Sequence, residues 1–444
     1  MKINSIKIDK LFEIFDYNIP FSNKENLLII TGPNGFGKTM ILNIIFSLFN
    51  RKFIFFHKLV FEKITICLDN NSSIVISKNM AYDKPNVKFT FAQNNEIIET
   101  FDYSNKLESD IERTIQKYLP IERIGADKWI DLRSRRNLTI DDIINEYADQ
   151  LPNEVSKNLL KIESKKTDEI LDSIRVHLIR VHLIREQRLL IREQRLFRKA
   201  QFILRDDREE KEQTITTETI LTYANELKQI IVQYSQRSFI ISQELDSSYP
   251  NRLIFEKGKV SEEEYNIRFN KLKEKQDKLK RNNLYEGKQE VLKYSKVDSK
   301  ALLVYLNDLE KKLGVFDDLL EKLELFTNIL NERRFTYKTI QIDREKGFYF
   351  KTNKGKELEL TQLSSGEQHE VVLLYELIFN AKQNVLVLID EPEISLHISW
   401  QKEFLNDLLR IIKIQNIQVA IATHSPSIIN DRWDLVYNLE KVDT

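Results

Sequence analysis

The segment "LLIITGPNGFGKTMILNII" is the feature that most constrains what this chain can fold into. It carries the pattern Gly-x-x-x-x-Gly-Lys-Thr, from Gly32 to Thr39, between an apolar run and a helical run. The glycines allow backbone N–H groups to surround a phosphate without Cβ clashes, and the following helix adds the positive end of its dipole. In this context the pattern predicts a buried strand, a phosphate-binding loop and a helix of an α/β domain.

The predicted loop supplies the residues that hold a nucleotide. Lys38 would reach the β- and γ-phosphates, and Thr39 would ligate Mg²⁺. A glycine turn that arises by chance is the alternative, and the strand before the loop and the helix after it argue against it. The residues expected to bind the nucleotide are Gly32, Pro33, Asn34, Gly35, Phe36, Gly37, Lys38, Thr39 and Met40.

A second motif, "VLVLIDEPE", places two acids directly after an apolar strand. The carboxyl ends of strands in α/β sheets are where ligands bind. We therefore expect Asp390 to hold Mg²⁺ and Glu391 to polarise the attacking water. Further along, "AIATHSPSII" ends another apolar strand in His424. A lone histidine is more often structural, but this position favours a sensor of the γ-phosphate.

The composition sets limits on other functions. The 444-residue chain has a formal net charge of zero, so its overall charge argues neither for nor against nucleic acid. Cys67 is the only cysteine, which excludes an intrachain disulfide and a Cys-rich metal site. The first residues lack the apolar core of a signal peptide, and no apolar run approaches the roughly 20 residues of a membrane helix. We expect a soluble, cytoplasmic protein that does not contact a membrane.

The pattern along the chain predicts three parts and a mixed α/β fold class. Residues 1–110 are rich in short strands and contain the loop. Residues 111–334 are mostly helical, and residues 335–444 return to apolar strands that alternate with helices, which indicates a parallel sheet buried on both faces. Leucines and aromatic residues in 4-3 spacing predict one heptad helix over 302–330 and another over 265–279, paired as an antiparallel hairpin at about 261–334. This hairpin is either a packed helix pair or a short projecting coiled coil.

Residues 174–197 contain two tandem duplications, "IRVHL IRVHL" and "IREQRLL IREQRLF". Apolar and polar residues alternate within the five-residue unit, as in a strand, and an odd-length repeat reverses the apolar face in the second copy. The segment is strongly basic as far as Arg205. It is either a solvated face or a contact to nucleic acid, an acidic partner or nucleotide phosphate.

The segment "LSSGEQ", Leu363 to Gln368, precedes the two acids and resembles the signature motif of ATP-binding-cassette (ABC) ATPases. This resemblance implies ATP and Mg²⁺ as cofactors and an ABC-type head with a helical, short coiled-coil insertion. It also implies that Ser364, Ser365 and Gly366 close over the nucleotide of a second subunit, in a homo-oligomer that is at least a dimer and possibly a ring of dimers. The Q-loop glutamine of the family would be Gln187 or Gln194.

The long insertion and the run "DEPEISLHISWQ", with His397 where transporters have the D-loop aspartate, resemble the RecF/SMC/OLD group. Within it the loop "GPNGFGKT", the segment "IREQRL", the run "SQELDSSYPNRL" at 242–253 and a compact helical pair resemble anti-phage defence ATPases, AriA of the PARIS system first and PtuA of Septu second. This implies a regulatory scaffold that controls a separate Toprim-type nuclease and senses a phage-encoded trigger protein. The alternatives are a RecF/SMC-like repair ATPase that binds DNA directly and a transporter subunit, which the insertion and the D-loop argue against.

Overall fold

The computed structural model places most of the chain in two compact units. One unit joins the two ends of the chain, Met1–Arg208 and Ala381–Thr444, and the other is Glu209–Asn380. Each unit is described below by itself. The residues that the structure describes are all except 22–23, 80–85, 104–118, 120, 126–127, 133–136, 139–164, 181–207, 286–292, 382–384, 395, 397 and 441–444.

A five-stranded parallel sheet forms the centre of the first unit, in the order β11-β15-β16-β3-β17. Its inner strands are apolar and buried, as the sequence predicted for a parallel sheet covered on both faces. The strand β11 comes from the part of the chain expected to be mostly helical. It contains residues 175–178 of the first copy of the five-residue repeat and residues 179–180 of the second. The strands are β11 (Arg175–Arg180), β15 (Val385–Asp390), β16 (Gln418–Ala422), β3 (Leu27–Thr31) and β17 (Val436–Asn438).

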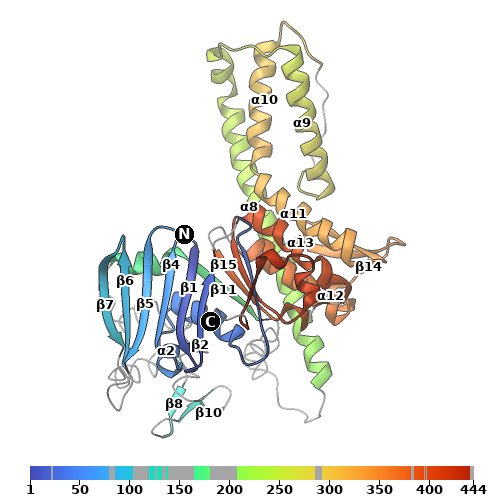
Figure 1. Cartoon of the computed structure of the whole chain (residues 1–444). Helices are drawn as coiled ribbons and strands as arrows, with labels where there is room; N and C mark the ends of the chain where they lie inside the picture. The colour runs from blue at the N-terminus through green and yellow to red at the C-terminus, as the bar shows by residue number, and fades with distance from the viewer. Residues whose placement is uncertain are drawn as a thin grey trace. The chain divides into compact units, whose positions relative to one another are not determined.

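An antiparallel sheet of six strands, in the order β2-β1-β4-β5-β6-β7, completes the β structure predicted for the N-terminal part (Figure 1). A small sheet, β10-β9-β8, lies in the same unit. The strands are β1 (Ile3–Leu11), β2 (Phe15–Pro20), β4 (Lys63–Leu68), β5 (Ser72–Asn79), β6 (Asn86–Gln93), β7 (Glu96–Tyr103), β8 (Ile121–Arg123), β9 (Trp129–Asp131) and β10 (Asn137–Leu138).

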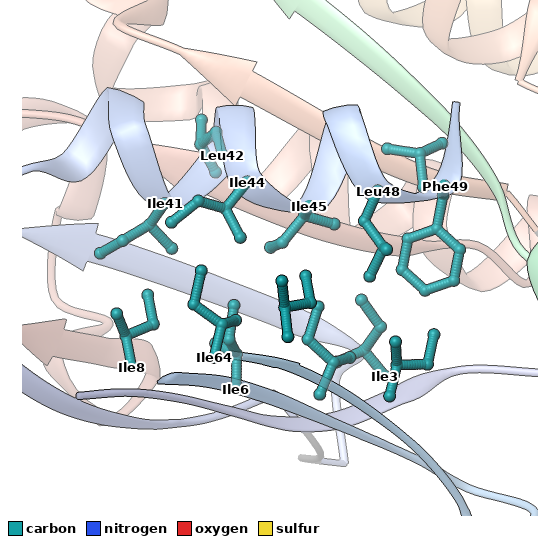
Figure 2. Close-up of a cluster of buried hydrophobic side chains, with 14 of the residues drawn as sticks. Ile3, Ile6, Ile8, Ile41, Leu42, Ile44, Ile45, Leu48, Phe49 and Ile64 are labelled. Carbon is teal, nitrogen blue, oxygen red and sulfur yellow. The ribbon is translucent and has the colours of Figure 1, made fainter. Parts of the chain in front are cut away.

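The helix after the glycine loop, α1 (Lys38–Phe49), contributes to one core with both sheets. Figure 2 shows Ile41, Ile44, Ile45 and Leu48 of this helix on the side that faces the isoleucines of β1 and β4. Leu386 and Ala420 of the parallel sheet belong to the same core. Since α1 is apolar on most of its surface, it is stable only when it is enclosed in this way. This burial fixes the position of the loop that precedes it.

The other helices that the structure describes in the first unit contact α1 or each other. Helix α13 contacts α14, and α6 contacts α1. Arg51 at the end of α1 pairs with Asp168 and Asp172 of α6, with nitrogen–oxygen distances of 2.5 and 2.7 Å. The helices are α2 (Ile54–Lys58), α6 (Lys165–Ser173), α13 (Ile398–Gln415) and α14 (Pro426–Ile429), with short 3₁₀ turns at Pro392–Ile394 and Trp433–Leu435.

Three long helices lie side by side in the second unit: α8 (Arg208–Phe255), α9 (Glu262–Arg281) and α10 (Ser299–Gly314) (Figure 1). The predicted heptad helix is two helices, because the chain breaks at Val315 and Phe316 before α11 (Asp317–Ile329). Most of the leucines in the 4-3 series are buried, as the heptad pattern requires.

The predicted antiparallel hairpin of the two heptad helices is wrong. Residue numbers rise together along the contact between α9 and the helices after it: Arg268 binds Asn307 at 2.6 Å, and Lys278 binds Glu324 at 3.0 Å. These helices are therefore parallel. The connection after Arg281 has about 17 residues, which can span the roughly 30 Å length of α9 and return the chain to its start.

The antiparallel partner of α10 is α8. Here the residue numbers run in opposite directions, since Lys312 binds Asp246 at 2.8 Å and Arg252 binds Asp308 at 2.8 Å. Much of α8 is polar, so its sequence contains no heptad repeat that would predict this long helix. A helical insertion is present as expected, but it packs as a three-helix bundle.

The rest of the second unit carries the "LSSGEQ" segment. A three-stranded antiparallel sheet, β12 (Lys338–Asp343), β13 (Gly347–Thr352) and β14 (Glu357–Leu358), leads into α12 (Ser365–Tyr375). A 3₁₀ turn at Leu360–Gln362 precedes α12, and π-helical turns occur at Leu330–Arg334 and Glu376–Asn380. Tyr223 of α8 donates a hydrogen bond to Glu376, which ties the end of α12 to the long helix.

These elements confirm the mixed α/β fold class, with an antiparallel β part, a parallel sheet and a helical insertion. Among the described residues, no helix is long and apolar enough to cross a membrane.

Candidate functional site

The ends of three neighbouring parallel strands carry the predicted chemical groups of the first unit. Strand β16 pairs with β15 on one side and with β3 on the other, and all three run in the same direction. Asp390 and Glu391 follow β15, His424 follows β16, and the glycine loop follows β3. Segments more than 300 residues apart in sequence therefore meet at one edge of the sheet.

The glycine loop has the backbone shape that its sequence predicts. Gly35 and Gly37 have φ angles of 89° and 84°, in the left-handed region that other residues rarely adopt. A Cβ at Gly37 would also lie 3.2 Å from Leu11 Cδ2. Gly37 directly precedes α1, so the loop ends at the helix N-terminus, where the helix dipole favours an anion.

Lys38 is folded onto this loop. Its Nζ donates hydrogen bonds to the carbonyl oxygens of Gly32, at 2.8 Å, and Pro33, at 3.0 Å. Burial lowers the pKa of Lys38 below its usual value, and the carboxylates of Glu391, Asp390 and Glu393 partly offset that effect. An ammonium group held next to the loop in this way can exchange the carbonyl oxygens for phosphate oxygens.

Thr39 and Asp390 meet across the site. The hydroxyl Oγ1 of Thr39 donates to Oδ1 of Asp390 at 3.1 Å, although the two residues are 351 positions apart. A hydroxyl and a carboxylate at this spacing are the two protein oxygens that Mg²⁺ typically uses beside phosphates, since it keeps several waters and takes few protein ligands. The pair therefore fits a Mg²⁺ ion that accompanies a bound triphosphate.

Glu391 and His424 are close but do not form a hydrogen bond. Nε2 of His424 lies 4.0 Å from Oε1 of Glu391, and both side chains are about one-third exposed. Glu391 has a φ angle of 49°, which is unusual for a residue with a side chain and costs on the order of 1–3 kcal/mol. Its N–H is held by the carbonyl of Ala422 at 2.8 Å. The backbone therefore holds Glu391 in a left-handed conformation directly after Asp390.

Glu393 is a site residue that the sequence reasoning missed. Its Oε1 accepts a hydrogen bond from the backbone N–H of His424 at 2.8 Å, and its Oε2 is buried with no hydrogen-bond partner in the described structure. Gln401 supports the same connection: its Nε2 donates to the carbonyl of Glu393 at 3.2 Å, and its Oε1 accepts from Ser425 Oγ at 3.0 Å. The last acid in "DEPE" was the available signal, but a motif does not reveal its partner.

Tyr17 is the second residue that was missed. It lies on β2, and its hydroxyl donates to the carbonyl of Phe36 in the glycine loop at 2.8 Å. Phe15 packs on both rings, with centroid distances of 5.7 Å to Tyr17 and 5.1 Å to Phe36. Burial raises the pKa of Tyr17 to about 12, so the hydroxyl stays protonated and keeps donating. The antiparallel sheet thus helps to fix the top of the loop.

The "LSSGEQ" segment in the second unit forms the start of α12. Ser364 is exposed and caps the helix: it exchanges hydrogen bonds with Glu367 in a capping box. A Cβ at Gly366 would meet no atom within 4 Å, so the backbone is open at this position. An exposed serine and an open glycine at a helix N-terminus are suited to contact an anion.

Some predicted residues lie outside the described residues. These are the two Q-loop candidates, Gln187 and Gln194, and the D-loop residue His397. Residues 181–197 of the tandem repeats, which include both copies of the seven-residue unit, lie there as well. Ser365 belongs to α12, and the relation of Ser364, Ser365 and Gly366 to a nucleotide stays a prediction.

Comparison with known proteins gives one extensive family match. The family model described as "AAA ATPase domain" matches residues 1–429. Solved structures of SMC head domains are also similar, with low TM-scores. The Smc head domain of Pyrococcus furiosus, bound to the C-terminal domain of ScpA, is 13% identical with a TM-score of 0.35, and the match covers 96% of this chain and 90% of that one. The SMC head domain of Thermotoga maritima is 12% identical with a TM-score of 0.33, over 99% and 94% of the two chains.

Proposed function

Because this chain belongs to the AAA ATPase domain family, we propose that it hydrolyses ATP at the ends of β15, β16 and β3. The contact of 3.1 Å between Thr39 and Asp390 carries this proposal, since it joins the loop that would hold the phosphates to the acid that would hold the metal. Lys38, Glu391 and His424 surround the same point. ATP is the nucleotide that the family implies, and Mg²⁺ fits the oxygen pair.

Each residue has a distinct part in this reaction. Lys38 and the backbone N–H groups from Asn34 to Met40 hold the phosphates, and Thr39 and Asp390 hold the ion, which would neutralise charge on the β- and γ-phosphates. Glu391 orients the attacking water and accepts a hydrogen bond from it. His424 donates to the γ-phosphate, at the end of the strand between the two motifs.

The active centre is shared between two subunits in this proposal. Ser364 and Gly366 of a second copy close over the γ-phosphate, as in the ABC ATPases that "LSSGEQ" resembles. The exposure of Ser364 and the open backbone at Gly366 support this part of the proposal. Such an enzyme is active only when assembled, as a dimer or a ring of dimers, which makes hydrolysis a switch.

The proposed output is control of a separate protein. By its resemblance to AriA and, second, to PtuA, the chain would be a regulatory scaffold of an anti-phage defence system. It would hold a Toprim-type nuclease and release it when a phage-encoded trigger protein is sensed. The motifs of the head support the ATPase, and the resemblance alone supports this choice of effector and trigger.

The alternative function is a RecF/SMC-like repair ATPase that binds DNA directly. The strongly basic segment from Arg175 to Arg205 favours it, because clustered arginines bind the phosphate backbone. Binding of bare duplex DNA with a steep dependence on salt concentration would support this alternative, and a lack of such binding would favour the scaffold.

Mixing two inactive variants tests the shared centre. Ser364→Arg blocks the "LSSGEQ" segment that a subunit contributes to its partner's centre. Lys38→Ala removes phosphate binding by the subunit's own glycine loop. An equal mixture should recover about a quarter of the wild-type ATPase rate, because half of the pairs are mixed and each mixed pair has one intact centre. Each variant alone should be inactive.

The control is a mixture in which both variants affect the same part of the centre. Lys38→Ala mixed with Asp390→Asn should stay inactive, since no pairing of these chains restores one complete centre. If the first mixture also stays inactive while labelled subunits are seen to exchange, the shared centre is wrong.

A further inference from the structure

One carboxylate oxygen of Glu367 accepts three hydrogen bonds at the "LSSGEQ" segment. Oε2 of Glu367 accepts from the backbone N–H of Ser364 at 2.9 Å and from the hydroxyl Oγ of Ser364 at 2.9 Å. It also accepts from Nζ of Lys338 at 2.9 Å. Glu367 and Ser364 are helix-capping partners within one motif, but Lys338 comes from a strand 29 residues earlier, and no motif predicts it.

Lys338 is held in place by its own surroundings. It begins β12 and is paired with Thr352 of β13 in the three-stranded sheet. Its ammonium lies 5.8 Å from the centre of the Phe335 ring, within the range of a cation–π contact. Both Lys338 and Glu367 side chains are only 19% exposed, so water screens their attraction less than it screens a surface pair.

The negative charge of Glu367 would repel the triphosphate that the "LSSGEQ" segment is proposed to approach. Burial alone would raise the pKa of Glu367, but the hydrogen bonds from Lys338 and from Ser364 lower it below its usual value. The carboxylate is therefore charged at neutral pH, directly beside Ser364. A negative charge within a few ångströms of the γ-phosphate opposes closure of the centre, unless a cation compensates it.

We propose that Lys338 is a positioning residue of the shared centre: it neutralises Glu367 and holds it, so that Ser364 can approach the γ-phosphate bound by a second subunit. This inference rests on the proposed function, in which Ser364 completes the partner's site. It adds a residue to that site which the motif does not contain.

The hydrogen bonds explain why the position of Glu367 matters as well as its charge. Ser364 has one hydroxyl proton, and in this structure it is donated to Glu367. To contact a phosphate oxygen, the hydroxyl must turn away from Glu367. Lys338 and the backbone N–H of Ser364 still bind the carboxylate after that turn, so the start of α12 keeps its cap while the hydroxyl is released.

The first experiment compares ATPase rates of three variants. Lys338→Met should lower turnover roughly tenfold or more, since a charged hydrogen bond at a partly buried site is lost, and it should leave ATP binding by the isolated subunit unchanged. Lys338→Met combined with Glu367→Gln should be clearly more active than Lys338→Met alone, because the uncompensated charge is gone. Glutamine also preserves the capping box. Lys354→Met, which removes an exposed lysine from the loop after β13, is the matched control and should behave as wild type.

A double variant no faster than Lys338→Met would overturn the proposal, and so would full activity of Lys338→Met itself. If Lys338→Met lowers the thermal midpoint of unfolding, the ATPase rate of Glu367→Gln is compared with that of the Lys338→Met and Glu367→Gln double variant. In the Glu367→Gln background, loss of Lys338 should change turnover little, and a large loss would contradict charge compensation.

Mixing experiments separate this inference from the proposed function. Lys338→Met should regain activity with Lys38→Ala and not with Ser364→Arg, because Lys338 serves the same part of the centre as Ser364. The opposite pattern would place Lys338 with the phosphate loop and overturn the inference. If the Ser364→Arg and Lys38→Ala mixture fails, the shared centre is wrong, while rescue by Glu367→Gln still reports on Lys338 independently.

Discussion

At the scale of single residues, we expect Glu393 to position His424 and to take no part in the chemistry itself. Its carboxylate holds the backbone of His424 at 2.8 Å, so it acts through that residue. Glu393→Ala should lower turnover by up to about 100-fold, because a small displacement of a catalytic group has effects of that size. Steady-state ATPase kinetics should show the loss in kcat, with little change in KM for ATP.

The conservative variant Glu393→Gln is the control for this prediction. Its side-chain oxygen can still accept from the N–H of His424, so it should retain most of the activity that Glu393→Ala loses. Glu391→Gln should lose most of its turnover, since it removes the carboxylate that is proposed to orient the attacking water. Equal losses in Glu393→Gln and Glu391→Gln would show that Glu393 takes part in the chemistry itself.

Some residues of the candidate site could be predicted from the sequence, and others could not. Lys38, Thr39 and Asp390 were identified because each lies in a short motif whose order of residues follows from the chemistry. Their convergence follows from the rule that ligands bind at the carboxyl ends of parallel strands. Tyr17 binds Phe36 and Lys338 binds Glu367 from separate strands, and no local pattern predicts such a contact.

At the scale of elements, the leucine repeat predicted burial correctly and helix direction wrongly. The 4-3 spacing of apolar residues determines which face of a helix is buried, but it is the same for parallel and antiparallel pairs. Direction depends on the connection after Arg281, which is long enough for either arrangement, and on α8, whose polar sequence shows no heptad. Exposed ion pairs such as Lys312 with Asp246 accompany this arrangement and contribute little to its stability.

The bundle makes a stability prediction that can be checked within one helix. Leu279 on α9 is fully buried, and Ile267 on the same helix is 52% exposed. Leu279→Ala should reduce the free energy of unfolding by about 2–5 kcal/mol, through lost burial and a cavity. Ile267→Ala should cost less than about 1 kcal/mol. Denaturant unfolding followed by circular dichroism measures both, and similar losses would contradict the packing of α9.

At the scale of the whole molecule, the phosphate loop and the "LSSGEQ" segment belong to different compact units. The first unit brings together Lys38, Thr39, Asp390, Glu391 and His424 from the two ends of the chain, and the second carries Ser364 and Lys338 on the part that also bears the helical bundle. In the proposed assembly, the second unit of one copy serves the first unit of another. Closure over ATP would then be coupled to the helices that a partner protein can contact.

The molecular mass of Glu391→Gln with and without ATP and Mg²⁺ tests this shared centre most directly. Sedimentation velocity should show the mass doubling, or rising to a multiple of a pair, when ATP is added. The reason is that the variant should bind ATP without hydrolysing it. ADP should not have this effect, and Ser364→Arg in the same background should abolish it. A chain that binds one ATP per subunit and stays monomeric at every concentration would contradict the account, as would rapid turnover by a wild-type chain that remains monomeric throughout the assay.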